Sequence, residues 1–143
     1  HRTSRRQRQM CIRDSYGEEI GMIGEQDPGN RRPMRFDPDK NEKELFNHFK
    51  SINQARLNYP SLAIGDQTIL KSKGPIFITL KSYFDERIIV VINNGPKIQD
   101  EFIELFRGCN TASNIIEEEV IDCFDKTFSL SIKPYSYKFY KLE

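Results

Sequence analysis

At Gly65 the hydrophobic pattern of the chain changes, so the parts on either side of it must fold differently. Before it, residues 42–58 repeat apolar side chains at helical spacing; after it, apolar and polar residues alternate or form short β-branched runs. Helical spacing turns one face of a helix toward a core, whereas alternation is typical of half-buried strands. The sequence therefore predicts a helix followed by an all-β region.

The limits of the predicted helix are marked by short polar and proline signals. Asp37 and Asp39, on either side of Pro38, can accept hydrogen bonds from the free N–H groups of a helix start. Pro60 ends the helix, because proline disfavours helical geometry at the residue before it. His48 is expected to be a solvated helix residue. The apolar face of this helix consists of Leu45, Phe46, Phe49, Ile52, Ala55 and Leu57.

Beyond Gly65 the sequence predicts a series of short strands with turns between them. The sequence Asn94-Gly95-Pro96 is a strong turn signal, and Asp85-Glu86 predicts a tight turn. Residues 108–113 are expected to form a loop, and residues 115–119 either a solvated turn or a short helix. Regular spacing of this kind favours an antiparallel β-sandwich. The predicted strands are 68–72, 76–83, 87–93, 101–106, 120–124, 127–132 and 135–142.

Composition limits the class of protein and the sites it can hold. With 37% hydrophobic and 30% charged residues, the 143-residue chain has the composition of a soluble globular protein. Cys11, Cys109 and Cys123 have neither metal-site spacing nor the density of a disulfide scaffold. We therefore expect free thiols in a reduced setting, which favours a cytoplasmic location. His1 and His48 cannot complete a zinc site with them, so no metal or cofactor is predicted.

The first 15 residues differ in charge from the rest of the chain. They contain five arginines and one aspartate, a net charge of +4, whereas the whole chain carries +1. An arginine-rich arm can indicate nucleic-acid binding. The segment QMCIRDS within it resembles translated adapter sequence, so we interpret residues 1–15 as a non-native leader. We predict no nucleic-acid partner and no membrane segment, because no apolar run approaches the roughly 20 residues that span a bilayer.

Residues 16–36 repeatedly interrupt regular structure and carry many charges. Glycines relax the restriction on φ and prolines fix it, so this segment is expected to be a loop. A loop positioned by a rigid scaffold can bind a ligand. Asp27 and Arg31 fit either that role or an ion pair that stabilises the loop. The interrupting residues are Gly17, Gly21, Gly24, Pro28, Gly29 and Pro33.

The same loop carries a resemblance to a known family. Tyr-Gly-Glu-Glu-Ile-Gly-Met at 16–22, followed by Gly-x-x-Asp-Pro-x-x-Arg-Arg-Pro-Met, resembles the end of the last barrel strand and the next loop of the α-amylase family of glycoside hydrolases. The neopullulanase, cyclomaltodextrinase and maltogenic amylase group is the most similar. The ending SIKPYSYKFYKLE resembles the closing hairpin of the family's C-terminal β domain.

The resemblance implies an α+β fragment of a larger enzyme. Residues 16–64 would be the C-terminal end of the (β/α)8 catalytic barrel, and residues 65–143 the all-β C-terminal domain, an antiparallel β-sandwich. One strand and one helix cannot close an eight-stranded barrel, so the missing N-terminal part of the barrel is an expected partner. Where the family has Leu-Arg, then Leu and Gly, at the end of its last barrel helix, this chain has Ala55-Arg56, Leu62 and Gly65.

The resemblance also implies the chemistry of the loop. In the family, an Asp-x-x-x-Arg in this position hydrogen-bonds a glucose unit on the non-reducing side of the cleavage point. Asp27 and Arg31 are therefore the predicted substrate-binding residues, with Arg32 holding the loop and Glu18 and Glu19 supporting the rim. The ligand would be an α-glucan oligosaccharide.

The expected function follows from that assignment. The parent enzyme would be a retaining glycosidase that acts on α-1,4-glucans such as maltodextrins, cyclodextrins or pullulan. The family's catalytic carboxylates lie on earlier barrel strands, so we expect no catalytic residue in this chain and no activity of the chain alone. The alternative is a carbohydrate-binding or structural β-sandwich module without catalysis. For that function Tyr135, Tyr137 and Tyr140 are the candidate exposed aromatic residues, although aromatic residues on such a hairpin more often belong to the core or its rim.

Overall fold

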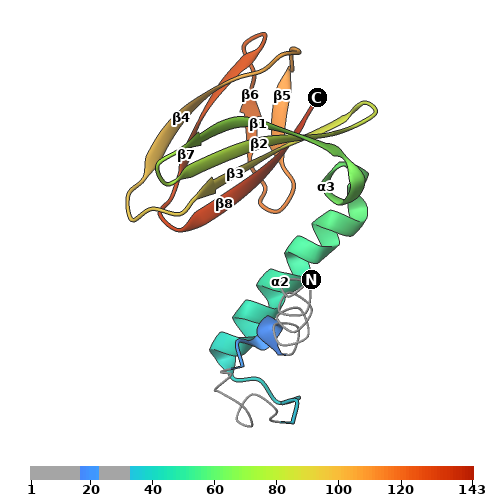
Figure 1. The fold of residues 1–143 in the computed structure, drawn as a ribbon, viewed down its shortest axis with the longest axis vertical. Helices are drawn as coiled ribbons and strands as arrows, with labels where there is room; N and C mark the ends of the chain where they lie inside the picture. Colours follow the sequence, from blue (N-terminus) through green and yellow to red (C-terminus); the bar gives the residue numbers. More distant parts are fainter. Residues whose placement is uncertain (1–16, 23–32) are drawn as a thin grey trace, which may run out of the picture. The chain divides into compact units, whose positions relative to one another are not determined.

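The computed structural model describes residues 17–22 and 33–143, and the chain divides into two compact units, His1–Ser51 and Ile52–Glu143 (Figure 1). Among the described residues, no helix is long and apolar enough to cross a membrane. The helical elements are the 3-10 helix η1 (Glu18–Ile20), α2 (Lys40–Asn58) and α3 (Pro60–Ile64). The strands are β1 (Asp66–Lys73), β2 (Ile76–Tyr83), β3 (Glu86–Asn93), β4 (Gln99–Glu104), β5 (Thr111–Asn114), β6 (Val120–Asp122), β7 (Thr127–Ile132) and β8 (Ser136–Leu142).

Helix α2 confirms the predicted helix and its start signal. The Asp39 carboxylate accepts a hydrogen bond from the Glu42 N–H at 2.9 Å, and the Glu42 carboxylate accepts one from the Asp39 N–H at 2.8 Å. This reciprocal capping box satisfies two donors that a helix start leaves free. The helix ends at Asn58, as Pro60 predicts. Pro60 also begins the short helix α3, since its fixed φ suits the first helical position.

The strand end expected within residues 16–22 is not found in the described part of that segment. Residues 18–20 instead form the 3-10 helix η1, with Gly17 and Gly21 on either side at φ of 73° and 66°. Met22 donates its N–H to the Gly17 carbonyl at 2.9 Å, which closes the turn. Two left-handed glycines reverse the backbone within six residues, and a strand cannot continue through that geometry.

The described strands form two sheets in which every pairing is antiparallel. The larger sheet has the order β1-β2-β3-β8-β5-β6, and the smaller sheet contains β4 and β7. This arrangement, visible in Figure 1, confirms the predicted antiparallel β-sandwich. The turn between β2 and β3 lies at 84–85, one residue before the predicted turn at Asp85-Glu86.

Strand β5 lies where the sequence predicts a loop, at residues 108–113. Its sequence, TASN, has little intrinsic strand preference. It forms because Ala112 pairs with Leu142 of β8 on one side and with Ile121 of β6 on the other. Residues 115–118, which could have been a turn or a short helix, are bends. Pairing with neighbouring strands therefore overrides local propensity here.

The core lies between the two sheets. Strand β7 alternates in burial, with Phe128, Leu130 and Ile132 inside and its serines outside. Side chains from the larger sheet meet them from the opposite side, and one continuous cluster results. This is the two-layer arrangement in which each sheet buries one face. The members from the larger sheet are Ile76, Ile78, Ile89, Val91, Ala112, Tyr140 and Leu142.

The outer face of the larger sheet is covered where α3 contacts β2 and β3. Ile88 and Ile89 are adjacent in β3 and therefore point to opposite faces, yet both are fully buried. The Ser61 N–H donates to the Glu86 carboxylate at 2.7 Å, which ties α3 to the start of β3. A Cβ at Gly65 would lie 2.4 Å from the Ser61 carbonyl oxygen. The chain can therefore pass from α3 into β1 at this distance only with glycine.

Candidate functional site

The predicted substrate-binding residues Asp27 and Arg31 lie outside the residues that the structure describes, as does Arg32. Their assignment stays a prediction. The structure does describe the segments on either side of their loop, residues 17–22 before it and residues from 33 after it. Both segments belong to the same compact unit.

The segment before the loop is held by packing on α2. Ile20 is buried, and a Cβ on Gly21 would come within 3.0 Å of the Leu45 side chain. Glu18 is exposed whereas Glu19 is half-buried, so the two adjacent carboxylates occupy different environments. The tight turn at Gly17–Gly21 therefore gives the chain a defined position and direction as it enters the loop.

The segment after the loop is held by a charged cluster at the start of α2. Arg35 donates from both terminal nitrogens to the Glu42 carboxylate, at 2.8 and 3.1 Å. The same carboxylate accepts from the Asp39 N–H, so Glu42 joins the loop exit to the helix cap. Two parallel N–H···O bonds fix orientation as well as distance. The described residues on either side of 23–32 are thus held in place, which a ligand-binding loop at the predicted position would need.

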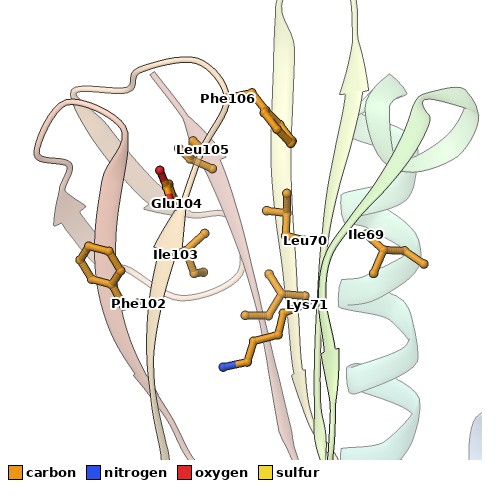
Figure 2. Close-up of a pocket in the computed structure, with 9 residues that line it drawn as sticks. Ile69, Leu70, Lys71, Phe102, Ile103, Glu104, Leu105 and Phe106 are labelled. Carbon is orange, nitrogen blue, oxygen red and sulfur yellow. The ribbon is translucent and has the colours of Figure 1, made fainter.

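A groove of about 440 Å³ lies between β1 and β4 of the β-sandwich (Figure 2). Leu70, Lys71 and Ile103 point into the space between the strands, whereas Phe102 and Ile69 point away from it. Lys71 donates to the buried Glu101 carboxylate, which bridges the two sheets. Phe106 stands at one end of the groove and is 77% exposed. The sequence prediction missed this groove, because its walls come from strands distant in sequence.

A second, shallower hollow of about 350 Å³ involves the outer face of the larger sheet. Val90, Ile92, Tyr137 and Phe139 line it together with Tyr135, which is 71% exposed. Of the three tyrosines named as candidates for an exposed aromatic residue, Tyr135 is exposed and Tyr137 is partly buried in the hollow.

Tyr140, the third candidate for an exposed aromatic residue, is fully buried, which agrees with the expectation that aromatic residues on such a hairpin more often belong to the core or its rim. Alternation along β8 explains this burial, because residues 140 and 142 face the core while residues 137 and 139 face outward. Its ring packs edge-on against Phe128 with 6.0 Å between the centroids.

A polar cluster surrounds the hydroxyl of Tyr140 at one edge of the core. The Glu119 carboxylate accepts from the Tyr140 hydroxyl at 2.7 Å and from the Lys138 ammonium at 2.8 and 2.9 Å. Burial raises the pKa of Glu119, but hydrogen bonds from Lys138, Tyr140 and Asn114 outweigh it and hold that pKa below its usual value. Burial and the bond to Glu119 raise the pKa of Tyr140 far above its usual range. Glu119 and Tyr140 are therefore each held in one protonation state near neutral pH, which suits a structural role rather than proton transfer.

Replacing Glu119 by glutamine is expected to destabilise the β-sandwich by about 1 kcal/mol at pH 7, because the charge-assisted bond to Lys138 is lost. The folded-state pKa of Glu119 is lowered, so the stability it contributes is present above its unfolded pKa and is lost as pH falls through the folded one. The difference in unfolding free energy between Glu119→Gln and the unchanged chain should therefore shrink below about pH 4.3. Urea unfolding across pH measures it. Glu118→Gln, at an exposed neighbouring position, is the control and should show no such trend.

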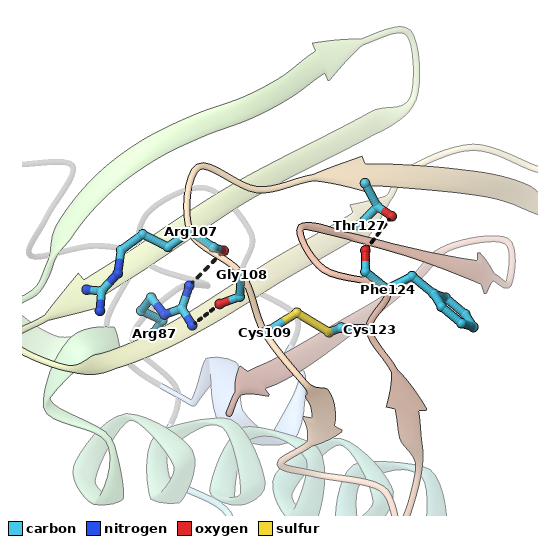
Figure 3. Close-up of a disulfide and its surroundings, with 7 residues drawn as sticks. All are labelled: Arg87, Arg107, Gly108, Cys109, Cys123, Phe124 and Thr127. Atoms are coloured by element: carbon cyan, nitrogen blue, oxygen red, sulfur yellow. Dashed lines mark hydrogen bonds between the residues drawn. A yellow bond between two sulfur atoms is a disulfide. The ribbon is translucent and has the colours of Figure 1, made fainter.

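Cys109 and Cys123 form a disulfide, so the expectation of free thiols is wrong for this pair (Figure 3). Their Cα atoms are 5.7 Å apart, within the range that the bond requires. The two segments are also joined by hydrogen bonds, from the Cys109 N–H to the Asp125 carbonyl and from the Cys123 N–H to the Asn110 carbonyl. Pairing of β5 with β6 brings the two cysteines together. Their spacing of 14 residues matches no metal or scaffold pattern, so no local sequence pattern indicates this bond.

His48 lies on the exposed side of α2, and its carbonyl accepts a hydrogen bond from the Ser51 hydroxyl at 2.8 Å. Within residues 17–22 and 33–143, no group of three or more histidine, cysteine, aspartate or glutamate side chains is placed to hold a metal ion.

The sequence of the chain is similar to those of cyclomaltodextrinases. No protein-family model matches the chain. It is 28% identical over 130 residues to a cyclomaltodextrinase of Geobacillus thermopakistaniensis, a match that covers 90% of this chain and 22% of that protein. It is 34% identical over 93 residues to a cyclomaltodextrinase of Thermoanaerobacter pseudethanolicus, covering 65% of this chain and 16% of that one.

The fold is shared with solved structures of related proteins. The α-amylase of Geobacillus thermoleovorans, in complex with acarbose, superposes with a TM-score of 0.79 at 29% identity. That match covers 90% of this chain and 28% of the other. The chain spans between 14% and 22% of the length of the curated relatives that it matches. In sequence and in fold it is a homologue of the C-terminal region of the cyclomaltodextrinases, maltogenic α-amylases and neopullulanases.

Proposed function

We propose that the chain is the C-terminal part of a glycoside hydrolase that acts on α-1,4-linked glucans such as maltodextrins, cyclodextrins or pullulan. Residues 16–64 would complete its catalytic (β/α)8 barrel, and residues 65–143 would be its C-terminal β domain. Residues 1–15 would be a leader foreign to that enzyme. The observation that carries the proposal is the 130-residue match to a cyclomaltodextrinase, which extends over both compact units.

The reaction proposed for the whole enzyme is retaining hydrolysis. It needs two carboxylates on opposite sides of the glycosidic bond, one as nucleophile and one as general acid and base. We place both, as the family resemblance implies, on barrel strands that precede Tyr16 in the enzyme's sequence. The 143-residue chain should then have no hydrolytic activity of its own.

The contribution proposed for this chain is to bind the glucan through its loop. The Asp27 carboxylate would accept hydrogen bonds from sugar hydroxyls, and the Arg31 guanidinium would donate several in one plane. The turn at Gly17–Gly21 and the Arg35–Glu42 pair support this role, because they order the described residues on either side of the predicted loop.

The test is expression of the longer reading frame that contains this chain, followed by assays on β-cyclodextrin, maltoheptaose and pullulan. We expect the long protein to release glucose or maltose from at least one of them. The 143-residue chain under the same conditions is expected to release none. Hydrolysis by the short chain, or a long protein that leaves all three substrates intact, would contradict the proposal.

In the long enzyme, Asp27→Ala is expected to lower kcat/KM for maltoheptaose by about 10- to 100-fold, since a hydrogen bond to a charged group contributes about 1.5–3 kcal/mol. Arg31→Ala should lower it by a similar factor. If the two residues instead form only an ion pair within the loop, the variants should lower the melting temperature and leave KM unchanged. Steady-state kinetics with thermal unfolding of the same preparations separates the two roles. His48→Ala, on the exposed side of α2, is the control.

A further inference from the structure

We propose that the groove between β1 and β4 is an accessory binding site for α-1,4-linked glucose oligosaccharides, additional to the Asp27–Arg31 loop. The inference rests on the proposed function, which supplies the class of ligand. The site itself is argued from the groove's position in the sandwich, its lining and its charges.

The groove lies along an open side of the sandwich. Strand β1 is the first strand of the larger sheet, and β4 pairs only with β7, so each has one edge without a partner among the described strands. Strand β7 contacts β3, β6 and β8, which places β4 toward β1 and β2. Unpaired strand edges present peptide N–H and C=O groups. Hydrogen-bonding groups of both kinds are therefore available at this side of the domain.

The lining of the groove suits a sugar ring, which has apolar C–H faces and polar hydroxyl groups. Much of its lining is apolar, including Leu70, Ile78, Ile103 and Leu105. Phe106, at one end, offers an exposed aromatic face against which the C–H face of a glucose unit can stack. A concave apolar surface with a few convergent polar groups is the usual form of a small-ligand site.

The charges of the groove favour a neutral ligand. Two charged side chains line it: Lys71, which is already paired with the Glu101 carboxylate buried beneath it, and Glu104, an exposed carboxylate that repels anions. An anionic ligand would have to compete with the Glu101 carboxylate for Lys71. A sugar hydroxyl can instead accept a hydrogen bond from one of the remaining N–H groups of the Lys71 ammonium without breaking the Lys71–Glu101 pair. A polyhydroxylated neutral chain is therefore a better match than a phosphate or an acidic peptide.

The shape of β1 argues against an extended peptide as the occupant. The pairing of β1 with β2 shifts register between Ile69 and Lys71, so β1 is bulged where it borders the groove. A bulge bends a strand and disrupts its edge, and a lysine at that edge further discourages another strand from pairing there. Strand addition is thus disfavoured at the position where the cavity is found.

The test is titration of the 143-residue chain with maltoheptaose, followed by the amide NMR signals of residues 69–71 and 102–106. We expect saturable shifts at these residues, with a dissociation constant on the order of 1 mM because the groove is open. Cellohexaose, with β-1,4 linkages, should shift them much less. Phe106→Ala is expected to weaken maltoheptaose binding by about five- to tenfold. Phe124→Ala is the matched control, since Phe124 is 79% exposed and does not line the groove.

Three outcomes would overturn the inference. The first is shifts confined to other residues, and the second is an affinity that Phe106→Ala leaves unchanged. The third is a dimer in sedimentation analysis that Phe106→Ala dissociates, because the groove would then bind a second copy of the chain. The proposed function is judged separately, by hydrolysis in the long enzyme. A hydrolytic long enzyme whose C-terminal chain binds no maltoheptaose removes this site alone, and binding with no hydrolysis removes the enzymatic proposal alone.

Discussion

Replacing Phe128 by alanine is expected to lower the free energy of unfolding of the β-sandwich by about 3–5 kcal/mol. Phe128 is only 1% exposed and lies in the cluster between the two sheets, against the ring of Tyr140. Truncation removes its transfer free energy and leaves a cavity that closely packed neighbours cannot fill. Because single domains are stable by only about 5–15 kcal/mol, this one change removes much of the total. Urea unfolding followed by near-ultraviolet circular dichroism measures the loss.

Phe102→Ala is the matched control for that substitution. Phe102 lies on β4, the strand paired with β7, opposite Ser129, and it is 68% exposed. Its removal should change stability by no more than about 0.5 kcal/mol. Equal losses of unfolding free energy for Phe128→Ala and Phe102→Ala would show that the smaller sheet does not pack through the face that carries Phe128.

Removing the disulfide is expected to cost about 3 kcal/mol, the value for a closed loop of about 15 residues. The double variant Cys109→Ala, Cys123→Ala should therefore unfold at lower urea than the unchanged chain, because the unfolded state regains the freedom that the bond removes. Adding dithiothreitol should bring the unchanged chain to the same midpoint and leave the double variant where it is. A midpoint that dithiothreitol does not move would contradict a stabilising role.

Thiol titration tests whether the bond forms in the purified protein. In a Cys11→Ser background the denatured chain should show no reactive thiol before reduction and two after it, from Cys109 and Cys123. Two thiols before reduction would show that the pair was reduced in that preparation. The hydrogen bonds from Arg87 to the carbonyls of Arg107 and Gly108 hold the same loop, so β5 and β6 should keep part of their order even without the bond.

The sequence predicted local structure best where a single strong signal acted. Asp39 and Pro60 marked the ends of α2 because capping and the missing proline N–H act over a few residues. The limits of β2 and β7 were predicted without error, since alternation or β-branched runs between turn signals define a strand locally. Strand β5 was missed because its four residues pair through partners at β6 and β8, which no short window contains.

The predicted substrate-binding residues came from the loop motif alone. Composition and spacing allowed two roles for Asp27 and Arg31, ligand binding or an ion pair within the loop. The family resemblance favoured ligand binding. Both residues lie outside the described part of the chain, so the choice still depends on the kinetic test. What the structure adds is the support on each side of the loop, the turn before it and the Arg35–Glu42 pair after it.

By itself the sequence determined the type and order of most elements and the resemblance to α-glucan-acting enzymes, because periodicity, turn chemistry and a short motif are properties of neighbouring residues. Only the tertiary structure decided which side chains meet across the sheets. It placed Tyr140 in the core rather than on the surface, joined Cys109 to Cys123 and formed the groove between β1 and β4. These features depend on strand order, which is set by packing over the whole domain and not by any local pattern.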